Sequence, residues 1–310
     1  MSKYAIGVDI GGSHICSALV DMDKKQIVPG SFSEFKVNNK ASADSIMGIW
    51  TNALLKTLSV ISKENLTGIG FAMPGPFDYE KGIALFERVA KYESLYNLNV
   101  VDYLRKSLGL GNHIPVRFMN DASSFAVGEA WIGKSAGFHR SMALTLGTGF
   151  GSAFIENGVP VLERDDVPQL GCVWHLPYRD GIADDYFSTR WYIKEYAGIT
   201  GKTLPGVKEI SDAAENDENA KKLFVQFGDN IGKFLGPWIK KFSAEVLVIG
   251  GNMTGAYNHL GPPFEKSLRE QKINIPVHLS EHMENAALVG SARLLEPEFW
   301  ENVKSLLSKM

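Results

Sequence analysis

Three glycine-rich turns, each directly after an apolar run, constrain this 310-residue sequence more than any other feature. Residues 4–21 read YAIGVDIGGSHICSALVD, and residues 142–157 read MALTLGTGFGSAFIEN. Both stretches predict a β-hairpin, with two apolar strands and a glycine-containing tip. In residues 245–257, EVLVIGGNMTGAY, a glycine pair again follows an apolar strand, and we expect a helix after it. The first two stretches resemble an internal repeat, so the sequence predicts two domains with related cores.

Glycines at such tips have two explanations. Without a Cβ atom the chain adopts positive φ readily, and its N–H groups can approach an anion closely. A hairpin turn that binds nothing also needs one or two glycines, and this is the simpler interpretation of any single stretch. Three glycine turns in one chain favour phosphate binding, to which the hydroxyls of Ser13 and Thr148 could contribute.

Asp9 lies near the end of the first apolar strand. A buried carboxylate needs a partner, because its desolvation is costly. Magnesium ions, which accompany nucleotide phosphates, prefer carboxylate oxygens and water as ligands. We therefore favour a Mg²⁺ role for Asp9, and hydrogen bonds from the neighbouring glycine amides are the alternative.

Asp121 stands where a strand-like run meets a helical pattern, in FMNDASSFAVGEAWIG, residues 118–133. The apolar and small positions after it recur with the spacing of one helix face. Asp and Asn are both favoured N-cap residues, so capping is one explanation of Asp121. A general base is the other, and this stretch alone does not decide between them.

Composition bounds the class of protein. Strands predicted at 68–72 and 115–119 alternate with helices predicted at 43–61 and 100–108, which indicates an α/β fold. The net charge of −3 gives no sign of a nucleic-acid partner. The two cysteines, Cys16 and Cys172, are too far apart for a C-x-x-C motif. We expect neither a signal peptide nor a membrane span, and therefore a cytoplasmic protein.

Five motifs in order resemble the ROK family of sugar kinases and repressors, within the actin-like ATPase superfamily. They are DIGGSH at 9–14, GFAMPGP at 70–76, NDA at 120–122, LGTGFG at 146–151 and IGGN at 249–252. The resemblance implies two ribonuclease-H-like domains around a central cleft. We place them at residues 1–118, completed by a C-terminal helix at about 284–310, and at residues 119–283. The helix is expected over about 284–295, with small residues for close packing.

The resemblance also implies roles for individual residues. Asp121 matches the catalytic base, which would accept the proton of a sugar hydroxyl, and Asp9 matches the group that holds Mg²⁺. Sugar contacts are implied for Gly75, Asn120, Asp121, His175 and Asp184. Contacts to ATP are implied for Asp9, Gly11, Gly12, Ser13, His14, Gly147, Thr148, Gly149, Gly250, Gly251 and Asn252.

Residues 172–184 depart from the family pattern. The usual glutamate and glycine before the conserved histidine are replaced by Cys172 and Trp174, and the cysteines of the zinc loop are missing. We therefore expect no structural zinc, since His175 alone cannot form a four-ligand site. His175 contacts a sugar hydroxyl or is an ordinary histidine with one hydrogen bond. Trp174 stacks on a sugar ring or packs in the core.

The sequence thus predicts an ATP- and Mg²⁺-dependent sugar kinase, glucokinase-like, acting on a hexose or hexose derivative. A ROK repressor is disfavoured, because only eight residues precede Asp9, too few for a DNA-binding domain. The remaining alternative is a sugar-binding or regulatory relative with weak catalysis. The family resemblance suggests a homodimer, without nucleic-acid or membrane partners.

Overall fold

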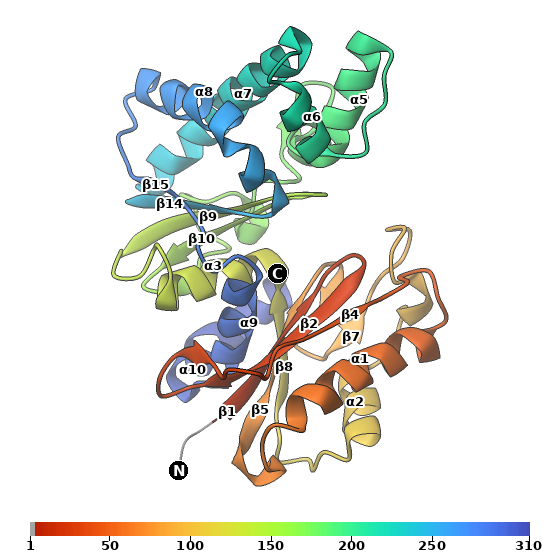
Figure 1. Cartoon of the computed structure of the whole chain (residues 1–310). Coiled ribbons are helices and arrows are strands. Elements are labelled where there is room, and N and C mark those ends of the chain that lie inside the picture. Colours follow the sequence, from red (N-terminus) through yellow and green to blue (C-terminus); the bar gives the residue numbers. More distant parts are fainter. Residues whose placement is uncertain (1–3) are drawn as a thin grey trace. The chain divides into compact units, whose positions relative to one another are not determined.

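A computed structural model describes residues 4–310 and divides the chain into two compact units (Figure 1). The first unit contains residues 1–136, 158–160 and 282–310, and the second contains residues 137–157 and 161–281. Each unit is built around its own β-sheet, as two α/β domains require. Among the described residues, no helix combines the length and the apolar character needed to cross a membrane.

The sheet of the first unit has the strand order β3-β2-β1-β5-β8, with β4 also paired to β2. Strands β1, β5 and β8 run parallel, and β2 is antiparallel to β1. The strands are β1 (Tyr4–Ile10), β2 (His14–Asp21), β3 (Gln26–Ile27), β4 (Ser33–Lys36), β5 (Leu66–Met73) and β8 (Val116–Asn120). Shorter strands outside this sheet are β6 (Phe77–Asp78), β7 (Ile83–Ala84) and β11 (Val159–Pro160).

Helices cover both faces of this sheet, because successive side chains of a strand point to opposite faces. On β2, Ser17 contacts Thr57 of α1, with 2.7 Å between the hydroxyl oxygens, while Cys16 and Ala18 pack against Leu288 of α9. The helices are α1 (Ala43–Leu58), α2 (Val100–Leu108), α3 (Asp121–Ile132), α9 (Glu284–Ala292) and α10 (Pro297–Val303). Short 3₁₀ helices are η1 (Lys63–Asn65), η2 (Glu93–Leu95), η5 (Arg293–Leu295) and η6 (Lys304–Lys309).

The second unit repeats the central pairing of the first. Strand β9 pairs antiparallel with β10 and parallel with β14, as β1 pairs with β2 and β5. The internal repeat is therefore visible in three dimensions. The strands are β9 (Arg140–Leu146), β10 (Phe150–Glu156), β12 (Pro177–Tyr178), β13 (Gly181–Ile182), β14 (Val246–Gly250) and β15 (Val277–Leu279). The helices are η3 (Gln169–Gly171), α4 (Ala183–Tyr186), α5 (Thr189–Thr200), α6 (Val207–Ala213), α7 (Glu218–Phe242), η4 (Asn252–Ala256) and α8 (Tyr257–Glu270).

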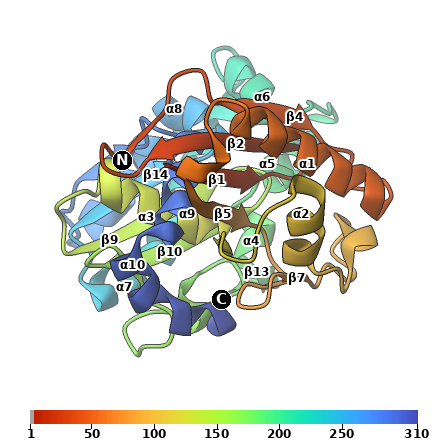
Figure 2. The same cartoon turned by 90° about the horizontal axis from the view of Figure 1, so that it is seen from below.

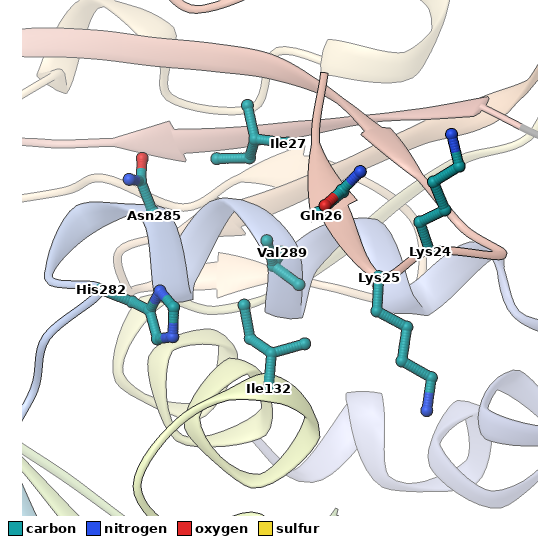
Figure 3. A pocket seen from close by; sticks show the side chains of 8 residues that line it. All are labelled: Lys24, Lys25, Gln26, Ile27, Ile132, His282, Asn285 and Val289. Atoms are coloured by element: carbon teal, nitrogen blue, oxygen red, sulfur yellow. The ribbon is translucent and has the colours of Figure 1, made fainter. Parts of the chain in front are cut away.

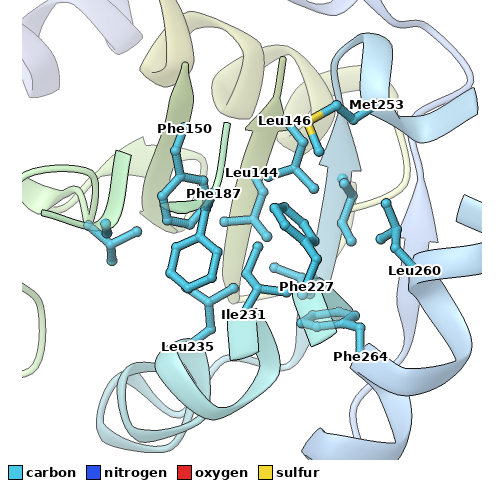
Figure 4. Packing of buried hydrophobic residues seen from close by; sticks show 14 of the residues in the cluster. Leu144, Leu146, Phe150, Phe187, Phe227, Ile231, Leu235, Met253, Leu260 and Phe264 are labelled. Atoms are coloured by element: carbon cyan, nitrogen blue, oxygen red, sulfur yellow. The ribbon is translucent and has the colours of Figure 1, made fainter. Parts of the chain in front are cut away.

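The core of the second unit lies between its sheet and the long helices α7 and α8 (Figure 4). Leu144 and Leu146 of β9 meet Ile231 of α7 and Phe264 of α8 there, and all four are almost fully buried. Burial of such side chains contributes about 1.5–3 kcal/mol each. This core holds the end of β9, from which the second glycine turn extends.

Helix α9 packs against α3, as both views show (Figures 1 and 2), and against β1 and β5. The close packing expected of the small residues in 284–295 is confirmed. A Cβ atom on Gly128 of α3 would lie 1.9 Å from the carbonyl oxygen of Ala286, and one on Gly290 would lie 1.9 Å from that of Ser124. The two helix backbones therefore touch directly.

This contact also affects where the first compact unit ends. We predicted that the first domain would end at residue 118, but the first unit continues to residue 136 and so includes α3. The reason is that α3 buries its glycine-bearing face against α9. The return of the chain near residue 284 agrees with the unit, which resumes at residue 282.

We predict that Gly290→Ala destabilises the protein. The added methyl group would overlap a backbone carbonyl that cannot move without shifting α3, so the free energy of unfolding should fall by about 1–3 kcal/mol or more. Gly48→Ala in α1 is the matched control, since nothing lies within 4 Å of its Cβ position. The better helix propensity of alanine should make that variant up to about 1 kcal/mol more stable. Urea unfolding measures both, and equal effects would show that the α3–α9 contact is loose.

Candidate active site

The first glycine turn joins β1 to β2 and contains Gly11, Gly12 and Ser13. The N–H of Gly11 donates to the carbonyl of His14 at 3.0 Å, which closes the tip. Two side chains from other segments hold the backbone carbonyl groups of the turn. The Tyr92 hydroxyl donates to the Gly11 carbonyl at 2.6 Å, and the Asn39 amide donates to the Gly12 carbonyl. Neither residue lies in a recognisable motif, so the sequence does not reveal this role.

Asp9 lies in β1 beside Ala72 of the parallel strand β5 and Cys16 of β2. Burial, together with the negative charges of Asp121 and Glu284, raises the pKa of Asp9 to about 8. The carboxyl group of Asp9 thus lies in the field of two further carboxylates of the first unit. A divalent cation bound through carboxylate oxygens would offset this charge, so Asp9 fits the Mg²⁺ role that the sequence suggested.

Asn120 and Asp121 occupy the junction between β8 and α3. The side chain of Asn120 accepts the N–H of Ser123 at 3.2 Å and is the N-cap. Asp121 is the first residue of the helix, and among residues 4–310 its Oδ1 accepts only the neighbouring N–H of Ala122, at 2.9 Å. The capping alternative for Asp121 is therefore wrong. A carboxylate in the first turn is still favoured by the helix dipole.

The hydroxyl group of Tyr79 lies near both Gly75 and Asn120. The hydroxyl of Tyr79 would be 3.4 Å from a Cβ atom on Gly75, and it accepts the amide of Asn120 at 3.4 Å. The same hydroxyl donates to the carbonyl of Met73 at 3.1 Å. The structure therefore brings together two predicted sugar contacts, and Tyr79 is a further candidate that the sequence did not reveal.

The second glycine turn joins β9 to β10 and contains Gly147, Thr148 and Gly149. Asp184 holds it, since Oδ1 accepts the N–H of Phe150 at 2.7 Å and Oδ2 accepts the guanidinium of Arg190. The N–H of Thr189 donates to the carbonyl of Gly147 at 2.8 Å. Asp184 thus positions the turn, while its contact with a sugar stays a prediction.

Gly250 is the last residue of β14, where it pairs with Thr145 of β9, and Gly251 and Asn252 follow it. Gly251 has φ of 88°, and a Cβ atom there would lie 2.4 Å from the carbonyl oxygen of Leu146. Only glycine fits this approach. The third glycine turn therefore lies next to the second, and a 3₁₀ turn and α8 follow it.

Residues 172–184, where the family pattern has a zinc loop, include a small hairpin of β12 and β13. Tyr178 of this hairpin packs against Phe187, with ring centroids 4.8 Å apart, and against Tyr186 and Phe234. Backbone pairing and aromatic packing thus hold the segment. That no structural zinc is bound stays a prediction, which elemental analysis of the purified protein would test.

Three side chains of this segment lie near one another. Cys172 Sγ is 3.7 Å from His175 Nδ1, and burial raises the pKa of Cys172 to about 12. Burial also lowers the pKa of His175. The ring of Trp174 meets that of His175 edge-on and is 43% exposed. Trp174 is therefore not a core residue, and its indole is open to a ligand.

The first unit also contains a cavity of about 550 Å³ (Figure 3). Its polar residues are Lys24, Lys25, Gln26, His282 and Asn285, over Ile27, Ile132 and Val289. None of the residues predicted to bind sugar or nucleotide lines it. The candidate catalytic residues of the first unit therefore lie at its glycine turn and at the β8–α3 junction.

Comparisons with known proteins show the family of the chain. The family model of the ROK family matches residues 5–165 and 178–298. The chain belongs to the ROK family. It is 27% identical to a glucokinase of Thermotoga maritima, covering 94% of this chain and 96% of that one. It is 25% identical to an N-acetyl-D-glucosamine kinase of Haemophilus influenzae, covering 93% and 98%. These matches support a carbohydrate kinase.

The fold is also that of a solved ROK enzyme. A glucokinase from Streptomyces griseus, crystallised with glucose and AMPPNP, superimposes with a TM-score of 0.74 at 23% identity. The match covers 94% of this chain and 98% of that one. The similarity spans both units, so the predicted α/β class and the resemblance to ROK sugar kinases are confirmed.

We predict that Asp9→Asn changes how stability depends on pH. The folded protein holds the Asp9 proton up to about pH 8, against 3.8 for an unperturbed carboxyl. The parent therefore loses stability as the pH rises through this window, by at most about 1.4 kcal/mol per pH unit. The variant lacks this loss. In urea unfolding without metal ions, its free energy of unfolding should therefore rise relative to that of the parent as the pH increases. A constant difference would show that Asp9 is ionised throughout.

Proposed function

We propose that the chain is an ATP-dependent sugar kinase, which transfers the γ-phosphate of Mg-ATP to a hydroxyl of a hexose or hexose derivative. Family membership supports the reaction class. The environment of the Asp121 side chain supports its role as the catalytic base. Phosphoryl transfer depends mostly on positioning and charge neutralisation, and a base near the attacking hydroxyl adds to both.

Asp121 has the properties of such a base. Asn120 already caps α3, so helix stability does not require the Asp121 carboxylate. Within residues 4–310, its Oδ2 accepts no hydrogen bond from the chain and is left for a ligand. The carboxylate would accept the proton of the sugar hydroxyl as that oxygen attacks the γ-phosphorus, and ADP would leave.

The remaining groups have supporting roles. Backbone N–H groups of the turns at Gly11–Ser13 and Gly147–Gly149 would bind phosphate oxygens, because glycine allows close approach. Asp9 would hold Mg²⁺, which when bound supplies positive charge to the phosphate oxygens. Gly75, Asn120 and His175 would contact the sugar.

Residues 172–184, which depart from the family pattern, suggest which sugar the enzyme uses. Cys172 replaces a charged acceptor of hydroxyl groups, and its buried thiol is a weak substitute. A site that lacks a bonding group discriminates less strongly between hydroxyl patterns. The exposed indole of Trp174 adds an apolar face. We therefore infer a hexose with an apolar substituent, such as an N-acetylated hexosamine, alongside or instead of glucose.

We predict that Asp121→Asn lowers kcat by about 10² or more, since asparagine cannot accept the proton. Its stability should change by only a few tenths of a kcal/mol, because Asn120 is the cap. Asp102→Asn, in the first turn of α2, is the control for loss of one carboxylate and should keep parent activity. Turnover of the Asp121 variant at the parent rate would exclude the base role.

The substrate is tested with Mg-ATP and a panel of glucose, mannose, N-acetylglucosamine and N-acetylmannosamine, by coupled detection of ADP. We expect higher kcat/KM for an N-acetylated sugar than for its parent hexose. Binding of a sugar without turnover would favour the regulatory relative instead.

A further inference from the structure

Three potential metal ligands converge between β2 and the first turn of α9, in residues that the sequence places far apart. His14 and Cys16 are two positions apart on β2 and share one face of the strand. Glu284 and Leu288 are four positions apart on α9 and share one face of the helix. Leu288 packs on Cys16, which places Glu284 over the same end of the strand.

The distances suit a single ion. Glu284 Oε1 lies 3.7 Å from His14 Nε2, and Glu284 Oε2 lies 3.8 Å from Cys16 Sγ. One ligand atom from each residue lies within 4.8 Å of the others. Ligand atoms of a tetrahedral zinc ion are about 3.3–3.6 Å apart, given its bond lengths of about 2.0–2.3 Å. Small side-chain rotations therefore bring all three to coordination distance.

We propose that His14, Cys16 and Glu284 bind a divalent transition-metal ion of the zinc class, with water as the fourth ligand. One nitrogen, one sulfur and one oxygen ligand are a set that suits Zn²⁺ and Co²⁺, whereas Mg²⁺ and Ca²⁺ take oxygen ligands. Glu284 and His14 are partly exposed, with side-chain exposures of 52% and 28%, so an ion can enter from solvent.

The surroundings favour a cation. Burial and the charges of Glu284, Asp9 and Glu34 raise the pKa of the Cys16 thiol, because each opposes a further negative charge. A metal ion reverses this effect: the metal–sulfur bond forms, the sulfur–hydrogen bond breaks, and the proton passes to solvent. The site differs from the zinc loop of the family pattern, which corresponds to residues 172–184 of the other unit.

The test uses the full chain, freed of metal and titrated with Co²⁺. We expect one ion per chain, a near-ultraviolet thiolate-to-cobalt charge-transfer band, and release of about one proton per ion in calorimetry in two buffers. No sugar or nucleotide is present, so failure here leaves the proposed kinase activity untouched.

Variants locate the ion. Cys16→Ser should abolish the band, and the matched Cys172→Ser, at the cysteine beside His175, should keep it. Glu284→Gln should keep the band but weaken Co²⁺ binding at least about tenfold, the smallest loss typical even of outer-shell changes. If Cys16→Ser does not fold, the Co²⁺ affinity of Glu284→Gln tests the proposal, because Glu284 is partly exposed and its substitution should not prevent folding. The proposal is overturned if no band forms, if the band depends on Cys172, or if Glu284→Gln binds Co²⁺ as tightly as the parent.

Discussion

The contact of α9 with backbone rather than side chains is the constraint on which the first unit depends. A Cβ atom on Gly7 of β1 or Gly70 of β5 would lie 1.9 Å from a carbonyl oxygen of α9, just as on Gly128 of α3. The helix therefore lies directly on the sheet and directly on α3. Because packed interiors tolerate little overlap, its position has almost no freedom.

This fixed position creates the electrostatics of the unit. The first residue of α9, Glu284, is held near β1 and β2, where Asp9 and Cys16 face each other across the strand pair. Asp121, at the start of the neighbouring helix α3, contributes to the same field. The negative charge is concentrated where the parallel strands end, a common location for binding sites in α/β sheets. A cation is the simplest partner for such a cluster, both at Asp9 and at the His14–Cys16–Glu284 group.

In the second unit, side chains hold the glycine turn between β9 and β10 in place. Glycine-rich backbone is flexible, so a binding turn needs supports that do not occupy its N–H groups on the ligand side. Asp184 takes one N–H after the turn and is itself anchored by Arg190. The preceding hairpin is fixed by Tyr178 among aromatic rings. Aromatic packing and hydrogen bonds thus hold both the turn and the hairpin in place.

The sequence alone determined those features that depend on local pattern. The strand–glycine–strand repeats appear as β1–β2 and β9–β10, and the predicted strand at 68–72 lies within β5. Helix α2 spans the predicted residues, and α1 ends at Leu58, three residues earlier than predicted. Such elements are set by the spacing of apolar residues and by glycine, which act over a few positions.

Only the tertiary structure decided which of Asn120 and Asp121 is the cap, because both are good caps and the choice depends on where β8 ends. It also decided the domain limit after residue 136, through the α3–α9 contact. Tyr92, Tyr79 and Asn39 support the site by side-chain hydrogen bonds from other segments, which leave no periodic signal. Cys16 and Glu284 are 268 positions apart, and only close packing of α9 on the sheet makes them neighbours.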